Sequence, residues 1–215
     1  MATTLRPWGA IEGIASSHRH EFAQRALELA KDAVRLQGVQ TLMLPPARVT
    51  AAHEAGHAIV YAASGEQVGC ITIRERRSLG GWSGFCELAT PMPDRLIPFK
   101  EPHRALLRAA VEIAGWCGEM AFEPSGFRCG SSIDEFVLVG GLVSGVAQAL
   151  ECDPERLFYM LIAAVVRFLE EEKECALAIQ RTLVREGRIR GPKLAALLAT
   201  VRRCDMTDLI FGFQS

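Results

Sequence analysis

Hydrophobic side chains recur at intervals of three and four residues along most of the chain, which is the spacing of helices with one apolar face. The pattern predicts a helix over residues 17–37, with an apolar stripe of Phe22, Ala26, Leu29, Ala33 and Leu36. Pro45-Pro46 then interrupts the chain. Further helices are predicted over 47–63, 102–122, 133–150, 154–187 (with or without a break) and a short stretch from Gly191.

Only one region has the pattern of strands. Cys70–Arg74 and Trp82–Leu88 are rich in β-branched and aromatic residues, and Gly80-Gly81 lies in the turn between them. The predicted fold class is therefore mostly α (α+β), a helical domain with a small β-hairpin. Ser132 and Glu135 have the spacing of a capping box, which predicts that a helix begins at Ile133 with Asp134 in its first turn.

Composition and charge narrow the class of protein. The chain has 215 residues with 24 basic and 25 acidic side chains, a net charge of −1, so a general nucleic-acid or membrane-surface binder is not expected. Its seven cysteines contain no C-x-x-C pair, which disfavours a disulfide framework or a cysteine zinc site and favours a cytoplasmic location. No signal peptide, membrane span or G-x-x-x-x-G-K-[ST] phosphate loop is recognisable.

The predicted helix 47–63 carries an H-E-x-x-H motif, His53-Glu54-Ala55-Gly56-His57. Residues four apart on a helix lie on the same face, so both imidazoles can reach one metal ion with Glu54 beside it. A zinc hydrolase needs this set, because two neutral nitrogens hold the ion and a carboxylate takes a proton from the attacking water. The alternative is a pair of core histidines with a solvated Glu.

A catalytic zinc ion usually has a third protein ligand. Asp134 is a candidate, because it follows a Gly/Ser loop and lies in the first turn of a helix, where it could instead only complement the helix dipole. The other candidates by residue type are His18, His20, His103, Glu112 and Glu119.

Several segments resemble, in order, the peptidase domain of the FtsH-type AAA+ zinc metalloproteases. These are Val49–Val60 around H-E-A-G-H, Cys70–Arg74 with the Leu79-Gly80-Gly81 turn, Ala114–Glu119, Gly130–Asp134, and the closing Ala176–Leu198. The resemblance covers about residues 45–200. It implies that His53, His57 and Asp134 bind one Zn²⁺ ion, that Glu54 is the general base, and that Glu119 lies near the site and supports it without binding the ion.

On this resemblance we expect three segments: an N-terminal extension with one helix (1–44), an FtsH-like metallopeptidase domain (45–200) and a C-terminal tail (201–215). The family carries an ATPase module and membrane helices before the protease, and neither is expected here. After Asp134 the chain is more apolar and glycine-rich than the family, so helix 135–150 is either buried core, which we favour, or a self-association surface that makes a homo-oligomer.

The expected function is therefore an ATP-independent zinc endopeptidase that cleaves flexible or unfolded protein segments, or peptides. A separate ATPase or adaptor is a possible partner, and no nucleic acid or membrane is expected. Trp82, Ser83, Gly84 and Phe85 are predicted to bind substrate by strand addition, the alternative being a strand that only supports the zinc helix. A non-catalytic, metal-stabilised interaction module and a zinc hydrolase of non-peptide bonds are the competing functions.

Overall fold

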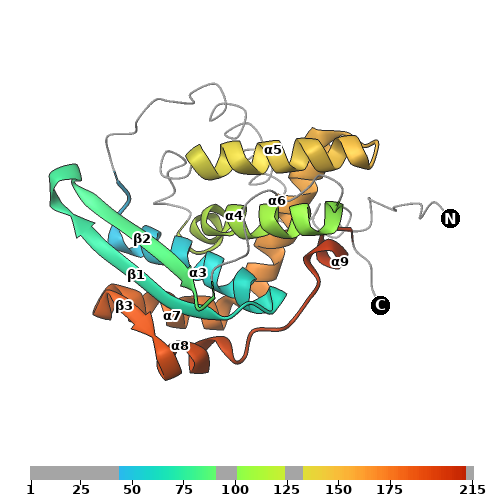
Figure 1. Cartoon of the computed structure of the whole chain (residues 1–215). Helices are drawn as coiled ribbons and strands as arrows, with labels where there is room; N and C mark the ends of the chain where they lie inside the picture. The colour runs from blue at the N-terminus through green and yellow to red at the C-terminus, as the bar shows by residue number, and fades with distance from the viewer. Residues whose placement is uncertain (1–43, 91–100, 124–132, 212–215) are drawn as a thin grey trace.

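The structure is a computed structural model that describes residues 44–90, 101–123 and 133–211, with the backbone alone at 133 and 134. The predicted helix over 17–37 lies outside these residues. The described chain is mostly α-helical with one small antiparallel sheet, as predicted (Figure 1).

The first described helix, α3 (Ala47–Ser64), carries the H-E-x-x-H motif and is buried on most of its surface. It begins after Pro46, whose carbonyl accepts a hydrogen bond from the Thr50 side chain, and it ends at Gly65 with a φ of 99°, a value that glycine adopts readily. Ala and Gly occupy many of its buried positions, so neighbouring helices can approach its backbone closely. The sheet, α4 and α7 all pack against it.

The sheet has three strands in the order β2-β1-β3. β1 (Val68–Arg76) and β2 (Gly81–Leu88) form the predicted hairpin, joined by a 3₁₀ turn (Arg77–Leu79) and Gly80, and β3 (Arg188–Arg190) pairs with the other edge of β1. Ile71 and Ile73 of β1 are buried on the side that faces α3, while Arg74 on the other side is exposed. The third strand was not predicted, because three residues are too few to show an alternating pattern.

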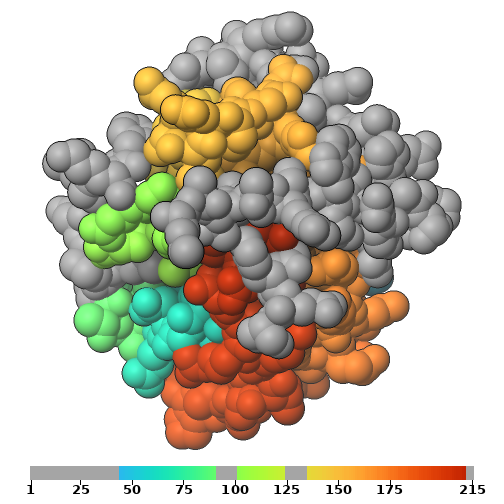
Figure 2. Space-filling view, turned by 90° about the vertical axis from the view of Figure 1, so that its right-hand side faces the viewer, coloured from blue at the N-terminus to red at the C-terminus, as the bar shows by residue number. Residues whose placement is uncertain are grey.

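The remaining helices are α4 (Pro102–Phe122), α5 (Ile133–Ala149), α6 (Pro154–Glu171), α7 (Lys173–Glu186), α8 (Gly191–Leu198) and α9 (Met206–Phe211). The predicted helix 154–187 is two helices separated at Glu172, and α9 lies in the segment predicted as a tail. On the face shown in Figure 2, the red C-terminal segment lies between the green of α4 and the orange of α6, and α9 packs against both helices.

Helix α5 buries one face and exposes the other. Phe136, Val139, Val143 and Val146 are in the core, whereas Leu138 is 43% exposed. Among the described residues, no single helix has the length and apolar composition of a membrane span. Helices α5 and α6 reach that length and apolar composition only when they are taken together, and the chain bends by 119° between them.

Candidate metal centre

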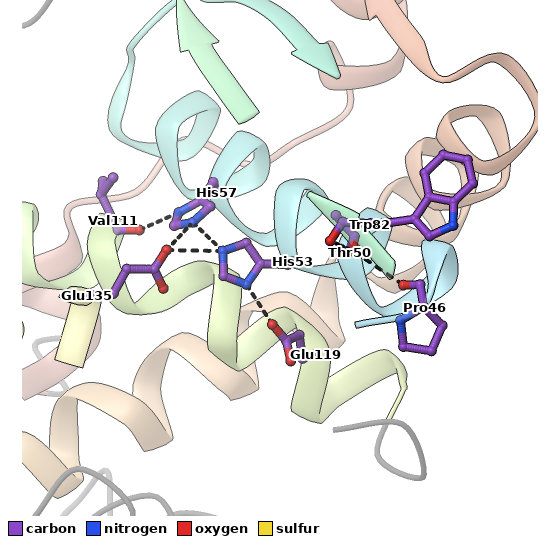
Figure 3. A network of polar contacts seen from close by, with 8 residues as sticks. All are labelled: Pro46, Thr50, His53, His57, Trp82, Val111, Glu119 and Glu135. Carbon is purple, nitrogen blue, oxygen red and sulfur yellow. Dashed lines mark hydrogen bonds and ion pairs between the residues drawn. The ribbon is translucent and has the colours of Figure 1, made fainter. Parts of the chain in front are cut away.

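Three helices distant in sequence supply the residues of the candidate site. His53 and His57 project from the same face of α3 toward α4, and Glu135 points at both rings from the first turn of α5 (Figure 3). The Nε2 atoms of the two histidines lie 3.1 Å apart. Oε1 of Glu135 is 3.1 Å from Nε2 of His53 and 3.4 Å from Nε2 of His57.

The far side of each imidazole ring is held by α4. Nδ1 of His53 is 2.7 Å from Oε1 of Glu119, whose side chain is fully buried, and Nδ1 of His57 donates to the Val111 carbonyl at 2.8 Å. A carbonyl and a carboxylate accept hydrogen bonds, so both neutral rings carry their proton on Nδ1 and a lone pair on Nε2. Histidine ligands of metal ions are commonly fixed in this way by a carboxylate or carbonyl partner.

The three groups fit a divalent metal ion. Two nitrogen lone pairs that face each other at 3.1 Å repel unless a proton or a cation lies between them. The second carboxylate oxygen of Glu135, Oε2, is buried and has no hydrogen-bond partner among the described residues. The donor atoms of His53, His57 and Glu135 all lie within 4.8 Å of one another. These residues could therefore hold a metal ion.

Gly115 of α4 keeps open the space where the two rings converge. A Cβ atom built on Gly115 would collide with Nε2 of both His53 and His57. The adjacent Trp116 contacts Phe136 of α5 edge to face, with ring centroids 4.9 Å apart, and both rings are fully buried. This aromatic contact fixes the first turn of α5, and with it Glu135, over Gly115.

Charge interactions among His53, His57 and Glu135 shift the pKa of all three side chains. Burial opposes ionisation of His53 and His57, but the adjacent Glu135 carboxylate raises the pKa of both rings above the usual value. The same pairing outweighs burial at Glu135 and lowers the pKa of its carboxyl group. The Glu135 carboxylate therefore favours the protonated form of each ring, and the rings favour the ionised form of Glu135.

Glu54 lies beside this cluster and beneath strand β2. It is 4% exposed, and burial raises the pKa of its carboxyl group although His53 and His57 act in the opposite direction. A Cβ on Gly84 of β2 would collide with the Glu54 carboxylate, so only glycine permits this approach. Within the described residues, the Glu54 carboxylate has no hydrogen-bond partner.

The outer edge of β2 has backbone N–H and C=O groups that point away from β1. The backbone N–H of Trp82 donates to the Pro45 carbonyl, and the Trp82 carbonyl accepts from the Thr50 hydroxyl at 3.4 Å, so both groups point away from β1. Backbone groups two residues further along a regular strand point the same way. Those of Gly84 therefore point to the edge that is unpaired in the described sheet, next to Glu54.

The predicted site residues are thus only partly brought together. His53, Glu54, His57 and Glu119 form one cluster, and Gly84 reaches it, whereas Ser83 and Phe85 lie on the opposite face of the sheet. The side chain of Asp134 and all of His18 and His20 lie outside the described residues, so the role of Asp134 stays a prediction. His103 is exposed at the start of α4, and Glu112 pairs with Arg108.

Two contributors were not identified from the sequence. Glu135 had been assigned to the helix cap, but its carboxylate lies at the histidines. Gly115 has no side chain that would indicate a role in the site. Comparison with protein-family models gives no match, and no match is found among curated proteins.

Proposed function

We propose that this protein is a zinc-dependent endopeptidase that hydrolyses peptide bonds in flexible or unfolded segments. The observation that carries the proposal is the convergence of two imidazole Nε2 atoms, 3.1 Å apart, and one carboxylate on a buried H-E-x-x-H helix. Two histidines and a glutamate are a known ligand set of catalytic zinc ions. The resemblance of Val49–Val60 and the later segments to FtsH-type peptidases supports the same activity.

In the proposed reaction, zinc and Glu54 have different roles. When bound, zinc would polarise a substrate carbonyl and lower the pKa of a water molecule toward neutral. Glu54 takes the proton from the attacking water and passes it to the leaving amine. Its raised pKa suits both steps, because a group that must accept and then release a proton works best with a pKa near the working pH.

The outer edge of β2 supports a polypeptide substrate. An extended segment that pairs with the backbone of Gly84 would pass directly beside Glu54. Trp82 is already paired with Pro45 and Thr50, so the pairing would be centred on Gly84 rather than on the start of the strand. This geometry favours the substrate-binding role of β2 over a purely supporting one.

The 215 residues contain no phosphate-loop motif, so we propose that they act by themselves on segments that are already flexible. Folded substrates should resist unless a separate ATPase or an adaptor delivers them. Zinc is proposed over other metals because imidazole and carboxylate in a three-ligand set suit it well.

The test is digestion of an unfolded protein, casein, by the wild type and by Glu54→Gln. The variant should retain zinc and lose cleavage by about 10²-fold or more, because removing a general base typically has an effect of this size. Glu174→Gln, at an exposed position of α7, is the matched control and should cleave normally.

Equal proteolysis by Glu54→Gln would contradict the mechanism. A wild type that binds zinc but cleaves no unfolded protein would instead support the alternative, a metal-stabilised interaction module.

A further inference from the structure

The face of the sheet turned away from α3 has an unusual concentration of positive charge. Side chains of successive strand residues alternate between the two faces, and the strand register places Arg74, Arg76, Arg188 and Arg190 together on this outer face. All four are exposed. Glu87 is the single carboxylate that the register puts on the same face within the described strands. The chain as a whole has a net charge of −1, so the cations are locally concentrated.

Hydrogen bonds confirm which side chains share this face. Arg188 donates to Sγ of Cys70 at 3.1 Å, and Arg76 donates to the Ser83 hydroxyl at 2.8 Å. Neither partner is a carboxylate, and neither guanidinium group forms an ion pair within the part of the chain that the structure describes. Within the described residues, Arg74 and Arg190 have no hydrogen-bond or ion-pair partner.

An exposed aromatic ring lies among these cations. Phe85 is 64% exposed, the highest value for a large hydrophobic side chain among the described residues. Thr72 separates it from Arg188, because Thr72 of β1 pairs with Phe85 on one side and with Arg188 on the other. We call Arg74, Arg76, Arg188, Arg190 and Phe85 the basic sheet face.

We infer that the basic sheet face binds an acidic segment of a protein substrate, away from the bond that is cleaved. Its charge is complementary to Asp and Glu side chains, and Phe85 offers an apolar contact beside them. Phe85 lies next to Gly84, so a chain that crosses the outer edge of β2 passes from this face to Glu54 within a short distance. A second contact of this kind raises the effective concentration of the cleaved segment at the site.

A polypeptide fits this face better than a single-stranded nucleic acid. Proteins that bind single-stranded nucleic acid in a basic groove stack successive bases on several aromatic rings. The described strands have one aromatic ring on this face. The free backbone edge of β2 can pair with a peptide and has no counterpart in nucleic-acid binding. The inference rests on the proposed function, because it takes the acidic partner to be a substrate of the peptidase.

The test measures binding by fluorescence anisotropy with the full chain carrying Glu54→Gln, so that the probe is not cleaved. The probe is a fluorescein-labelled peptide of alternating Glu and Ser with a central Phe, and a second peptide has Lys in place of Glu. The acidic peptide should bind, more weakly as salt is added, and the Lys peptide should not. Arg190→Glu should weaken binding about tenfold, whereas Arg181→Glu, the same change at an exposed position of α7, should alter it less than about twofold.

Equal binding of the acidic peptide by Arg190→Glu and the unchanged chain would overturn the inference. So would tighter binding of an oligothymidylate than of the acidic peptide, because the face would then recognise nucleic acid. The binding assay needs no catalysis, so the two proposals fail separately. Casein cleavage with no Arg190-dependent binding rejects this inference alone, and Arg190-dependent binding without cleavage by the wild type rejects the peptidase alone.

Discussion

Gly115 determines whether the two histidine rings can bind the same metal ion. Its missing side chain leaves the space where both Nε2 atoms converge. Gly115→Ala should therefore weaken zinc binding by at least about tenfold, an effect comparable to the loss of a supporting residue around a metal ligand. Zinc content after dialysis, measured by elemental analysis, checks this expectation.

Gly140→Ala is the matched control for this substitution. Gly140 is also a helical glycine, but a Cβ there would meet no atom of the described residues beyond its own helix backbone within 4 Å. Both variants should stay folded. Ala is favoured over Gly in a helix by about 1 kcal/mol, and the Cβ of Gly115→Ala meets side chains, which can rotate, rather than backbone atoms. Normal zinc content in both would mean that the ion is not held where the rings converge.

The identity of the third ligand is a second prediction at this scale. The carboxylate of Glu135 contacts both histidines, while the resemblance to FtsH-type peptidases assigns the ligand to Asp134. The described geometry predicts that Glu135→Ala loses bound zinc and that Asp134→Ala retains it. Metal analysis of the two variants decides between neighbouring residues, and the reverse pattern would return the role to Asp134.

The sequence could not separate these two residues for a physical reason. Adjacent residues on a helix point about 100° apart, so the choice depends on how the first turn of α5 is rotated. That rotation is fixed by the packing of Phe136 on Trp116, a contact between helices that no local pattern reveals. The spacing of His53 and His57, in contrast, lies within one helix and was readable directly.

At the scale of elements, the crossing of α3 and α4 brings two helix backbones into contact. A Cβ on Gly56 of α3 would collide with the Ala114 carbonyl of α4. Backbone atoms cannot move aside as a flexible side chain can. Gly56→Ala should therefore lower the free energy of unfolding by about 2 kcal/mol, a typical cost of overpacking.

Urea denaturation followed by circular dichroism measures this change. Gly141→Ala is its control, because a Cβ on that glycine of α5 would meet no other described residue within 4 Å. This variant should be as stable as the wild type or slightly more so. An unchanged stability of Gly56→Ala would show that the two helices are not held this closely.

Helix boundaries were predicted best where proline or glycine residues mark them. Pro46 and Gly65 flank α3, and α6 begins at Pro154 as predicted. Its cap is Asp153, which accepts a hydrogen bond from the backbone N–H of Glu155. The third strand and α9 were missed because they are short and owe their existence to neighbours. Ile189 of β3 is buried against β1, and α9 packs on α4 and α6.

At the scale of the whole molecule, the site depends on segments that are far apart in sequence. The motif on α3 contributes His53, Glu54 and His57, α4 supplies Glu119 and the backbone at Gly115, and α5 supplies Glu135. The sequence identified the H-E-x-x-H residues but not the space around them, which comes from the packing of three helices and a strand. The proposed peptidase activity belongs to this assembly rather than to the motif alone.

The most direct test of the central claim is cleavage of casein by the full chain after metal removal and metal return. Dialysis against a chelator should abolish cleavage, and one equivalent of zinc per chain should restore it in the wild type but not in Glu54→Gln. Cleavage that persists without metal, or that zinc restores equally in Glu54→Gln, would contradict a zinc peptidase in which Glu54 is the general base.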